Sequence, residues 1–449
     1  MARRCAILAR GALPMLTQPF LTDLDSRAAV KGSRDPLGIQ PIWTRLGRHV
    51  IGNLTTVSTS VRDFTTLLLG YYFAERVAEE GGREGDLATF LKWEQLAAYA
   101  RAKVNDERSF RGVERVYRNL SEGPRIHLSA APSEQILGNQ KIYGLWGLYT
   151  VPARSSCLVE GSPTRLTAAG RKLVEALYLP TFSKAGFRDA QVIVKRLAER
   201  QVTLDTGKKD HALLEAVGKV LQRRFLALEA EVFREHLRDG GPVDSTGGLQ
   251  PLLARVMDST FEDPEWRLSA DRVRRLARLA GQQGETGAML ADRLERIRAA
   301  ELVLAPAASL FDLLLGRDGQ TLAEVARDVR SHWGKSVRTI DAEAFSQLEA
   351  ELREAAGDSD AAARWVLLGR AMASGDYVEA LRHLLAQNRF VMNARANAAP
   401  WAELRDGRLQ VRFRDEQASP LPEQKELPGY WRHAYFLDAL RTVAFALRS

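Results

Sequence analysis

Apolar side chains recur at helical spacing almost without interruption from residue 182 to residue 387. They return every three or four residues, which places them on one face of an α-helix, and polar or glycine-bearing breaks divide the segment. No unit of about 20 to 50 residues repeats, so we expect an irregular helical domain and not a solenoid. The predicted helices span residues 183–202, 209–238, 246–259, 269–281, 285–315, 320–333, 341–356, 359–373 and 376–388.

The regions on either side are predicted to be helical as well, apart from one hairpin. Helices are expected over residues 35–50, 61–80 and 87–104, with a polar, glycine-rich loop before the third. Near the C-terminus, Asp406-Gly407 separates two short apolar runs, which is a strong signal for a β-hairpin. A helix over residues 431–447 then completes a mainly α, multi-helical fold.

The sequence favours a cytoplasmic protein without a membrane segment. Cys5 and Cys157 are the only cysteines, so no disulfide framework is implied. The longest apolar run, residues 64–74, is about half of the roughly 20 residues that a membrane-spanning helix needs. The basic residues 1–22 resemble a targeting presequence only superficially, because Arg10 interrupts their apolar stretch and no small-residue cleavage site follows.

No pattern in the chain predicts a catalytic residue, a metal site or a cofactor. The histidines lack the i, i+3 and i, i+4 pairing of helical metal ligands, and neither a phosphate-binding loop nor a Gly-x-Ser-x-Gly elbow occurs. A metal-dependent nuclease is one alternative, because Asp406, Asp415 and Glu416 place acids at both ends of the hairpin. Arg412 and Arg414 on its second strand suit phosphate or partner binding better than a metal.

The net charge of +8 is concentrated in one part of the chain. Residues 101–200 carry 17 Lys and Arg against 9 Asp and Glu. A basic balance confined to one segment is expected of a surface that contacts nucleic-acid phosphates. A solvated helical surface is the alternative interpretation.

This basic segment contains the most informative pattern, between residues 108 and 177. A helix over residues 139–152 is followed by a short apolar strand, a Gly161-Ser162-Pro163 turn, a second short strand and a helix over residues 168–177. The succession predicts a helix-wing-helix arrangement. Its characteristic residues are Leu158, Val159, Glu160, Arg165, Leu166, Thr167, Gly170, Arg171, Leu173 and Val174.

These residues resemble the wing of winged-helix transcription regulators, in which a similar string closes the domain. The resemblance covers about 70 of 449 residues. It implies that Leu158 and Leu166 pair as wing strands and that Thr167 caps the last helix. It also implies that residues 139–149 take the place of the recognition helix.

A DNA-binding wing would use the cations on this helix and around the hairpin as phosphate contacts. Winged helices also bind proteins, and here Tyr143, Trp146 and Tyr149 stand where a DNA reader carries Arg, Asn and Gln. Both kinds of partner, DNA and other protein subunits, therefore stay open. The candidate nucleic-acid contacts are Lys141, Arg154, Arg165, Arg171 and Lys172.

The predicted organisation has four regions. Residues 1–107 form an N-terminal helical region, 108–180 a winged-helix-like domain, and 181–395 a helical domain. Residues 396–449 form a hairpin and a C-terminal helix that pack on the helical domain. We expect a non-catalytic nucleic-acid-binding or adaptor subunit of a multiprotein complex.

A broader resemblance adds a biological setting. Residues 35–53, 62–64 and 431–437 give the chain a likeness to uncharacterised helical proteins that accompany nucleases or helicases in bacterial phage-defence and restriction loci. The likeness implies a bacterial multiprotein system with an antiviral role. A winged-helix transcriptional regulator is the main alternative, and a metal-dependent nuclease is a weaker one.

Overall fold

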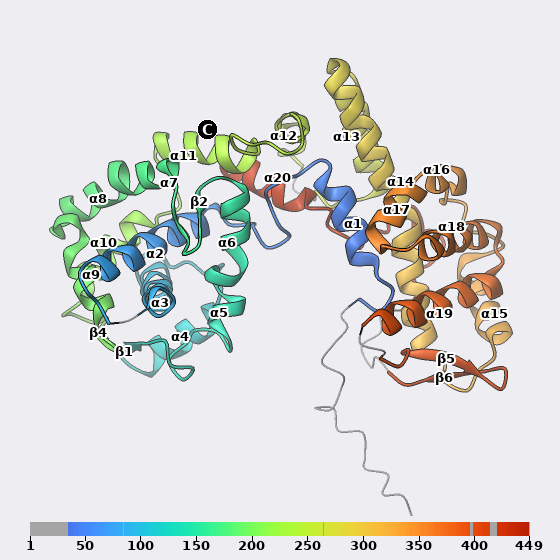
Figure 1. Ribbon diagram of the computed structural model, residues 1–449, viewed down its shortest axis with the longest axis horizontal. Coiled ribbons are helices and arrows are strands. Elements are labelled where there is room, and N and C mark those ends of the chain that lie inside the picture. The colour runs from blue at the N-terminus through green and yellow to red at the C-terminus, as the bar shows by residue number, and fades with distance from the viewer. Residues whose placement is uncertain (1–34, 84, 264, 396–397, 414–419, 449) are drawn as a thin grey trace, which may run out of the picture.

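The computed structural model describes residues 35–448, apart from 84, 264, 396–397 and 414–419. It shows a mainly α protein whose helices gather in two lobes (Figure 1). The basic residues 1–22, with Cys5 and Arg10, and the acids Asp415 and Glu416 considered for a nuclease lie outside the described part, as does Arg414. No helix in the part described has the length and apolarity needed to cross a membrane.

The first lobe is built around two long, almost completely buried helices, α2 (Val61–Glu79) and α3 (Asp86–Asn105). Because α2 is apolar on most of its circumference, other helices cover it on several sides (Figure 1). The remaining elements of this lobe are α4 (Val113–Glu122), α5 (Gln140–Tyr143), α6 (Leu145–Ser155), α7 (Ala168–Leu173), the π-helical turn η1 (Val174–Tyr178), α8 (Leu179–Lys184), the 3-10 turn η2 (Arg188–Ala190), α9 (Gln191–Ala198), α10 (His211–Val220), α11 (Ala227–Phe233) and the π-helical turn η3 (Arg234–Arg238).

The second lobe is organised by α14 (Gly284–Leu315), the longest helix of the described chain. Its first half packs against α13 (Ala270–Gly281), and its second half is buried among later helices. Helix α1 (Ile39–Arg48), although close to the N-terminus, packs in this lobe against α14 and α17. The other elements are α15 (Leu322–Trp333), α16 (Ala342–Ser346), α17 (Glu349–Ala356), α18 (Ser359–Ser374), α19 (Tyr377–Ala394) and the 3-10 turn η4 (Leu427–Gly429).

Helices α12 (Leu249–Asp258) and α20 (Leu437–Ala446) lie between the lobes (Figure 1). A buried polar cluster fixes this junction. The Asn53 amide donates to the Ser156 hydroxyl (3.0 Å) and to the backbone carbonyl of His236 (2.8 Å), while Gln250 donates to Asn53 Oδ1 (2.8 Å). The loop after α1, the end of α6, η3 and α12 are therefore held together by amide side chains that satisfy otherwise unpaired carbonyls.

Three small two-stranded antiparallel sheets complete the described chain. Strand β1 (Arg125–Leu128) pairs with β4 (Val202–Asp205), and β2 (Val159–Glu160) pairs with β3 (Arg165–Leu166). The hairpin predicted around Asp406-Gly407 is confirmed as β5 (Ala402–Arg405) and β6 (Arg408–Val411). Both turn residues have positive φ, 51° at Asp406 and 77° at Gly407, which is the turn geometry that Asp-Gly favours between strands.

The C-terminal helix is shorter than predicted. It begins at Leu437 and not near Trp431, because Tyr435 and Phe436 adopt positive φ and residues 431–436 turn toward α14. Glu301 on α14, with no exposed surface, accepts hydrogen bonds from the backbone amides of Arg432 (2.5 Å) and His433 (3.0 Å). Its other oxygen accepts from the Tyr435 hydroxyl (2.9 Å) and lies 2.8 Å from His433 Nδ1. One buried carboxylate thus stabilises an irregular conformation in a segment whose local sequence favours a helix.

Replacing Glu301 by Ala is expected to lower the free energy of unfolding by about 3 to 5 kcal/mol, because the buried donors of residues 432–435 lose their acceptor. Urea denaturation followed by tryptophan fluorescence measures the change. Glu295→Ala is the control, since Glu295 lies on the same helix, is 39% exposed and pairs with Arg298. It should change the stability by less than about 1 kcal/mol, and equal losses in both variants would contradict the role given to Glu301.

Candidate interface on the winged-helix-like segment

The segment singled out in the sequence forms a compact helix-hairpin-helix unit. The predicted helix over residues 139–152 is two helices, α5 and α6, separated at Gly144. Strands β2 and β3 follow, and α7 packs close behind them. Thr167 caps α7 as expected: its hydroxyl accepts from the Gly170 amide (3.3 Å) and donates to the Cys157 carbonyl (2.8 Å).

The strand register differs by one residue from the predicted pairing of Leu158 with Leu166. Leu166 pairs with Val159, while the Leu158 carbonyl accepts from the Thr167 amide (3.2 Å) at the α7 end of the hairpin. Gly170 makes this close approach possible, because a Cβ atom there would lie 2.5 Å from the Leu158 oxygen. Any larger residue at position 170 would push α7 away from the hairpin.

Two of the five candidate cations are already paired with acids of the first lobe. Arg165 donates to Asp86 (2.8 Å), and Arg171 donates to both carboxylate oxygens of Glu75 (3.0 Å each). Charge-assisted hydrogen bonds of this kind restrict the guanidinium and offset its charge locally. These two side chains therefore tie the hairpin and α7 to α2 and α3.

The other three candidates are exposed. Arg154, at the end of α6, donates to the Gly161 carbonyl (3.2 Å) and the Thr164 hydroxyl (2.9 Å), so it braces the turn of the hairpin. Lys141 on α5 and Lys172 on α7 have no hydrogen-bond or ion-pair partner among the described residues. The structure thus divides the candidate set into bracing arginines and freely exposed lysines.

Three large apolar side chains are exposed on α5 and α6. Ile142 and Tyr143 on α5 are each 51% exposed, and Val151 on α6 is 58% exposed. Trp146 is partly buried and contacts Tyr71 and Phe90, with ring centroids 5.3 and 5.2 Å apart, so it packs against the core. Exposed apolar side chains on two short, consecutive helices mark a candidate interaction surface.

A buried acid beneath these helices sets their geometry. Glu94 on α3 accepts from the Leu145 backbone amide (2.8 Å) at the first turn of α6 and from the Gln140 side-chain amide (2.8 Å) on α5. A Cβ atom at Gly144 would lie 2.8 Å from both oxygens of this carboxylate, which explains why a glycine stands between the two helices. Glu94 therefore positions the exposed face of α5 and α6 from below.

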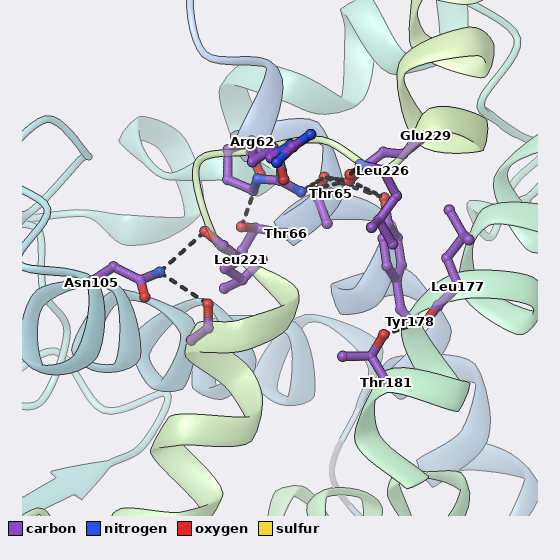
Figure 2. Close-up of polar contacts among 12 residues, drawn as sticks. Arg62, Thr65, Thr66, Asn105, Leu177, Tyr178, Thr181, Leu221, Leu226 and Glu229 are labelled. Atoms are coloured by element: carbon purple, nitrogen blue, oxygen red, sulfur yellow. Dashed lines mark hydrogen bonds and ion pairs between the residues drawn. The ribbon is translucent and has the colours of Figure 1, made fainter. Parts of the chain in front are cut away.

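A buried ion pair joins α2, α11 and η1 in the first lobe (Figure 2). Arg62 on α2 contacts Glu229 on α11 at 2.5 Å, and Tyr178 in η1 donates its hydroxyl to the same oxygen at 2.7 Å. The guanidinium also lies over the Phe225 ring, 4.3 Å from its centroid. Burial and the neighbouring Glu229 raise the pKa of Tyr178 well above its ordinary value, so the phenol stays protonated and acts as a donor.

Sequence reasoning missed these buried acids, although one signal was present. Glu94, Glu229 and Glu301 each follow or interrupt apolar runs in predicted helices, where an acid on the core face requires a partner. The partners come from distant parts of the chain, so the sequence could have indicated the burial but not the contacts.

The described residues offer no group of three or more His, Cys, Asp and Glu arranged to hold a metal ion. Comparisons with models of protein families, with curated proteins and with solved structures found no match. The interpretation of this site therefore rests on its own geometry.

Glu94 should make stability depend on pH. The pKa of Glu94 is raised to about 7, mainly because the side chain is buried. The hydrogen bonds from Gln140 and Leu145 oppose this increase, as does Arg111, whereas the nearby Asp63 adds to it. Since the folded pKa lies above the unfolded one, the stabilisation is complete below the unfolded pKa and is lost as pH rises through the folded pKa.

Between about pH 5 and 8, this group should reduce the free energy of unfolding by about 3 kcal/mol, and Glu94→Gln should flatten that part of the profile. Urea titrations at a series of pH values measure the slope. Glu114→Gln, at an exposed acid on α4, should leave the slope in place. A wild-type profile that is already flat over this range would refute the assignment to Glu94.

Proposed function

We propose that this protein is a non-catalytic adaptor subunit whose winged-helix-like segment binds another protein through α5 and α6. The observation that carries the proposal is the exposure of Ile142, Tyr143 and Val151 on these two short helices. Aromatic and aliphatic side chains that are exposed together become the buried centre of protein interfaces. The partner surface should be apolar at its centre.

The charges around this centre favour a partner with an acidic rim. Lys141 lies next to Ile142 on α5, and Arg154 lies one turn from Val151 on α6, both exposed. Complementary charges at a rim steer association and fix orientation more than they add affinity.

Nucleic-acid binding by the same segment stays the alternative prediction. The pairing of Arg165 with Asp86 and of Arg171 with Glu75 favours the protein partner, because a phosphate would have to compete with a carboxylate already in place. The proposal also includes a cytoplasmic location, which is based on the cysteine content. A role in an antiviral multiprotein system is based on the resemblance to helical proteins of phage-defence loci.

Val151→Glu is expected to weaken binding of the protein partner about tenfold or more, because it places a charge in the centre of a desolvated interface. The measurement is quantitative co-purification from native cells, with nuclease treatment to remove contacts bridged by nucleic acid. Leu367→Glu is the matched control, since Leu367 is a 45% exposed apolar residue on α18 in the other lobe.

Partners retained by the Leu367 variant and lost by the Val151 variant would identify the interface. If Val151→Glu changes no partner, while combined Lys141→Ala and Lys172→Ala substitutions abolish binding to duplex DNA, the adaptor proposal fails and the nucleic-acid alternative replaces it.

A further inference from the structure

A second basic surface, outside the segment chosen from the sequence, lies on α13. Five arginines and a single acid occur between Trp266 and Ala280. The buried face of α13, Val273, Leu276, Ala277 and Ala280, packs on α14. Four of the arginines, Arg272, Arg274, Arg275 and Arg278, lie on α13 outside this buried face, whereas Arg267 precedes the helix. Figure 1 shows this helical arm extending beyond both lobes.

Three of these arginines have no acidic partner. Arg272 contacts Asp263 at 2.9 Å, and Arg274 lies 3.9 Å from Asp271. Arg267, Arg275 and Arg278 are exposed and form no ion pair with any residue that the structure describes. This arrangement contrasts with the hairpin of the first lobe, where the arginines are held by carboxylates. Unpaired arginines on a protruding helix are open to a polyanion.

A groove of about 740 Å³ lies at the base of α13. Its volume falls within the range of ligand sites in proteins. One wall comes from residues 265–269 and Arg272, and the other from residues 429–434 and Asp438. The second wall is the segment that Glu301 fixes, so the groove has a rigid side.

Aromatic rings line both walls of this groove. The Trp266 ring contacts two guanidinium groups, those of Arg272 (4.9 Å from the ring centroid) and Arg441 (5.2 Å). Tyr430 and Trp431 on the opposite wall are each partly exposed. Trp431 is kept in place by a hydrogen bond from its indole nitrogen to the His433 carbonyl (2.6 Å) and by an edge contact with Tyr435.

Charged groups of both signs line the groove: Arg267, Arg272 and Arg432 with Glu265, Asp438 and His433. Arg272 is paired with Asp263 and Arg432 with Asp312 (2.8 Å), so Arg267 is the lining arginine that has no ion-pair partner among the described residues. The basic face of α13 continues this charge outward: Arg275 and Arg278 lie about 4.5 and 9 Å further along the helix axis than Arg272, at about 1.5 Å per residue. A ligand that fits must combine a flat ring with several anionic groups in a row.

We propose that the groove and the exposed face of α13 bind a single-stranded nucleic acid. Arg267, Arg275 and Arg278 contact successive backbone phosphates, and an unpaired base stacks on Tyr430 or Trp431. Stacking platforms beside a basic track are the general means by which proteins hold single strands. A duplex would satisfy the arginines but keeps its bases stacked on one another, away from the aromatic walls.

The test uses the full-length protein with labelled oligothymidylate, oligouridylate and a duplex of equal length, titrated by fluorescence anisotropy at several salt concentrations. The single strands should bind more tightly than the duplex. Arg275→Glu combined with Arg278→Glu should weaken single-strand binding about tenfold or more and reduce the slope of log affinity against log salt by about 1.4. Comparison of the two oligonucleotides shows whether DNA or RNA is preferred.

Two further variants separate the groove from general charge effects. Arg370→Glu with Arg389→Glu removes two exposed arginines of α18 and α19 and should change affinity far less. Trp431→Leu should weaken binding about five- to tenfold, whereas Trp431→Phe, which loses the same indole hydrogen bond but keeps a ring, should retain most of the affinity.

Equal losses in the α13 pair and the α18–α19 pair would overturn the proposal, and so would tighter binding of the duplex. Binding of polyglutamate in place of the single strands would also overturn it, by showing that the arm recognises an acidic protein. Because these variants leave α5 and α6 untouched, the outcome is independent of the adaptor interface.

Discussion

The hydrogen bonds of Glu301 are the interaction on which the second lobe most depends. A buried carboxylate on the longest described helix accepts from two backbone amides and the Tyr435 hydroxyl of a segment more than 130 residues later in the chain. Without an acceptor at this position, the donors of residues 432–435 would be buried unpaired. That carboxylate therefore fixes the segment that leads into α20, while the polar cluster around Asn53 holds the junction between the lobes.

Buried acids that accept hydrogen bonds from neighbouring elements also stabilise the first lobe. Glu94 holds the start of α6, and Glu229 joins α2, η1 and α11 through Arg62 and Tyr178. In each case an acid on an apolar helix attaches a neighbouring element whose own apolar surface is small. Helices as short as α5 or α7 bury too few side chains to fix their own orientation, so directional hydrogen bonds specify it.

The difference between local apolar patterns and long-range hydrogen bonds explains which parts of the structure could be predicted from the sequence. Apolar periodicity gave the mainly α fold and long helices such as α14 and α18, and Asp-Gly gave the hairpin of β5 and β6, because these signals are local. The breaks at Gly144, between α10 and α11, and before Leu437 were missed. Each depends on a polar side chain from a distant part of the chain. Glu94 acts at the first break and Glu301 at the third. At the second, Asn105 donates to the Gly218 and Leu221 carbonyls (Figure 2). The candidate cations were identified by charge alone, which cannot distinguish Arg171, paired with Glu75, from Lys172, exposed beside it.

The distribution of unpaired charge is therefore a better guide than net charge to the surfaces that are available to a phosphate. In the segment with the largest basic excess, Arg165 and Arg171 are paired with carboxylates of the same lobe. Helix α13 lies in a region without such an excess, yet its Arg275 and Arg278 form no ion pair with any described residue. An arginine that is already paired with a carboxylate has lost side-chain freedom and part of its hydration, so exchanging that carboxylate for a phosphate gains little. An arginine exposed on a helix exchanges only water and counterions, and the release of those counterions favours binding. The two lobes thus have different physical capacities: an apolar surface on α5 and α6, positioned from below by Glu94, and a basic, aromatic-lined surface at α13, positioned by Glu301.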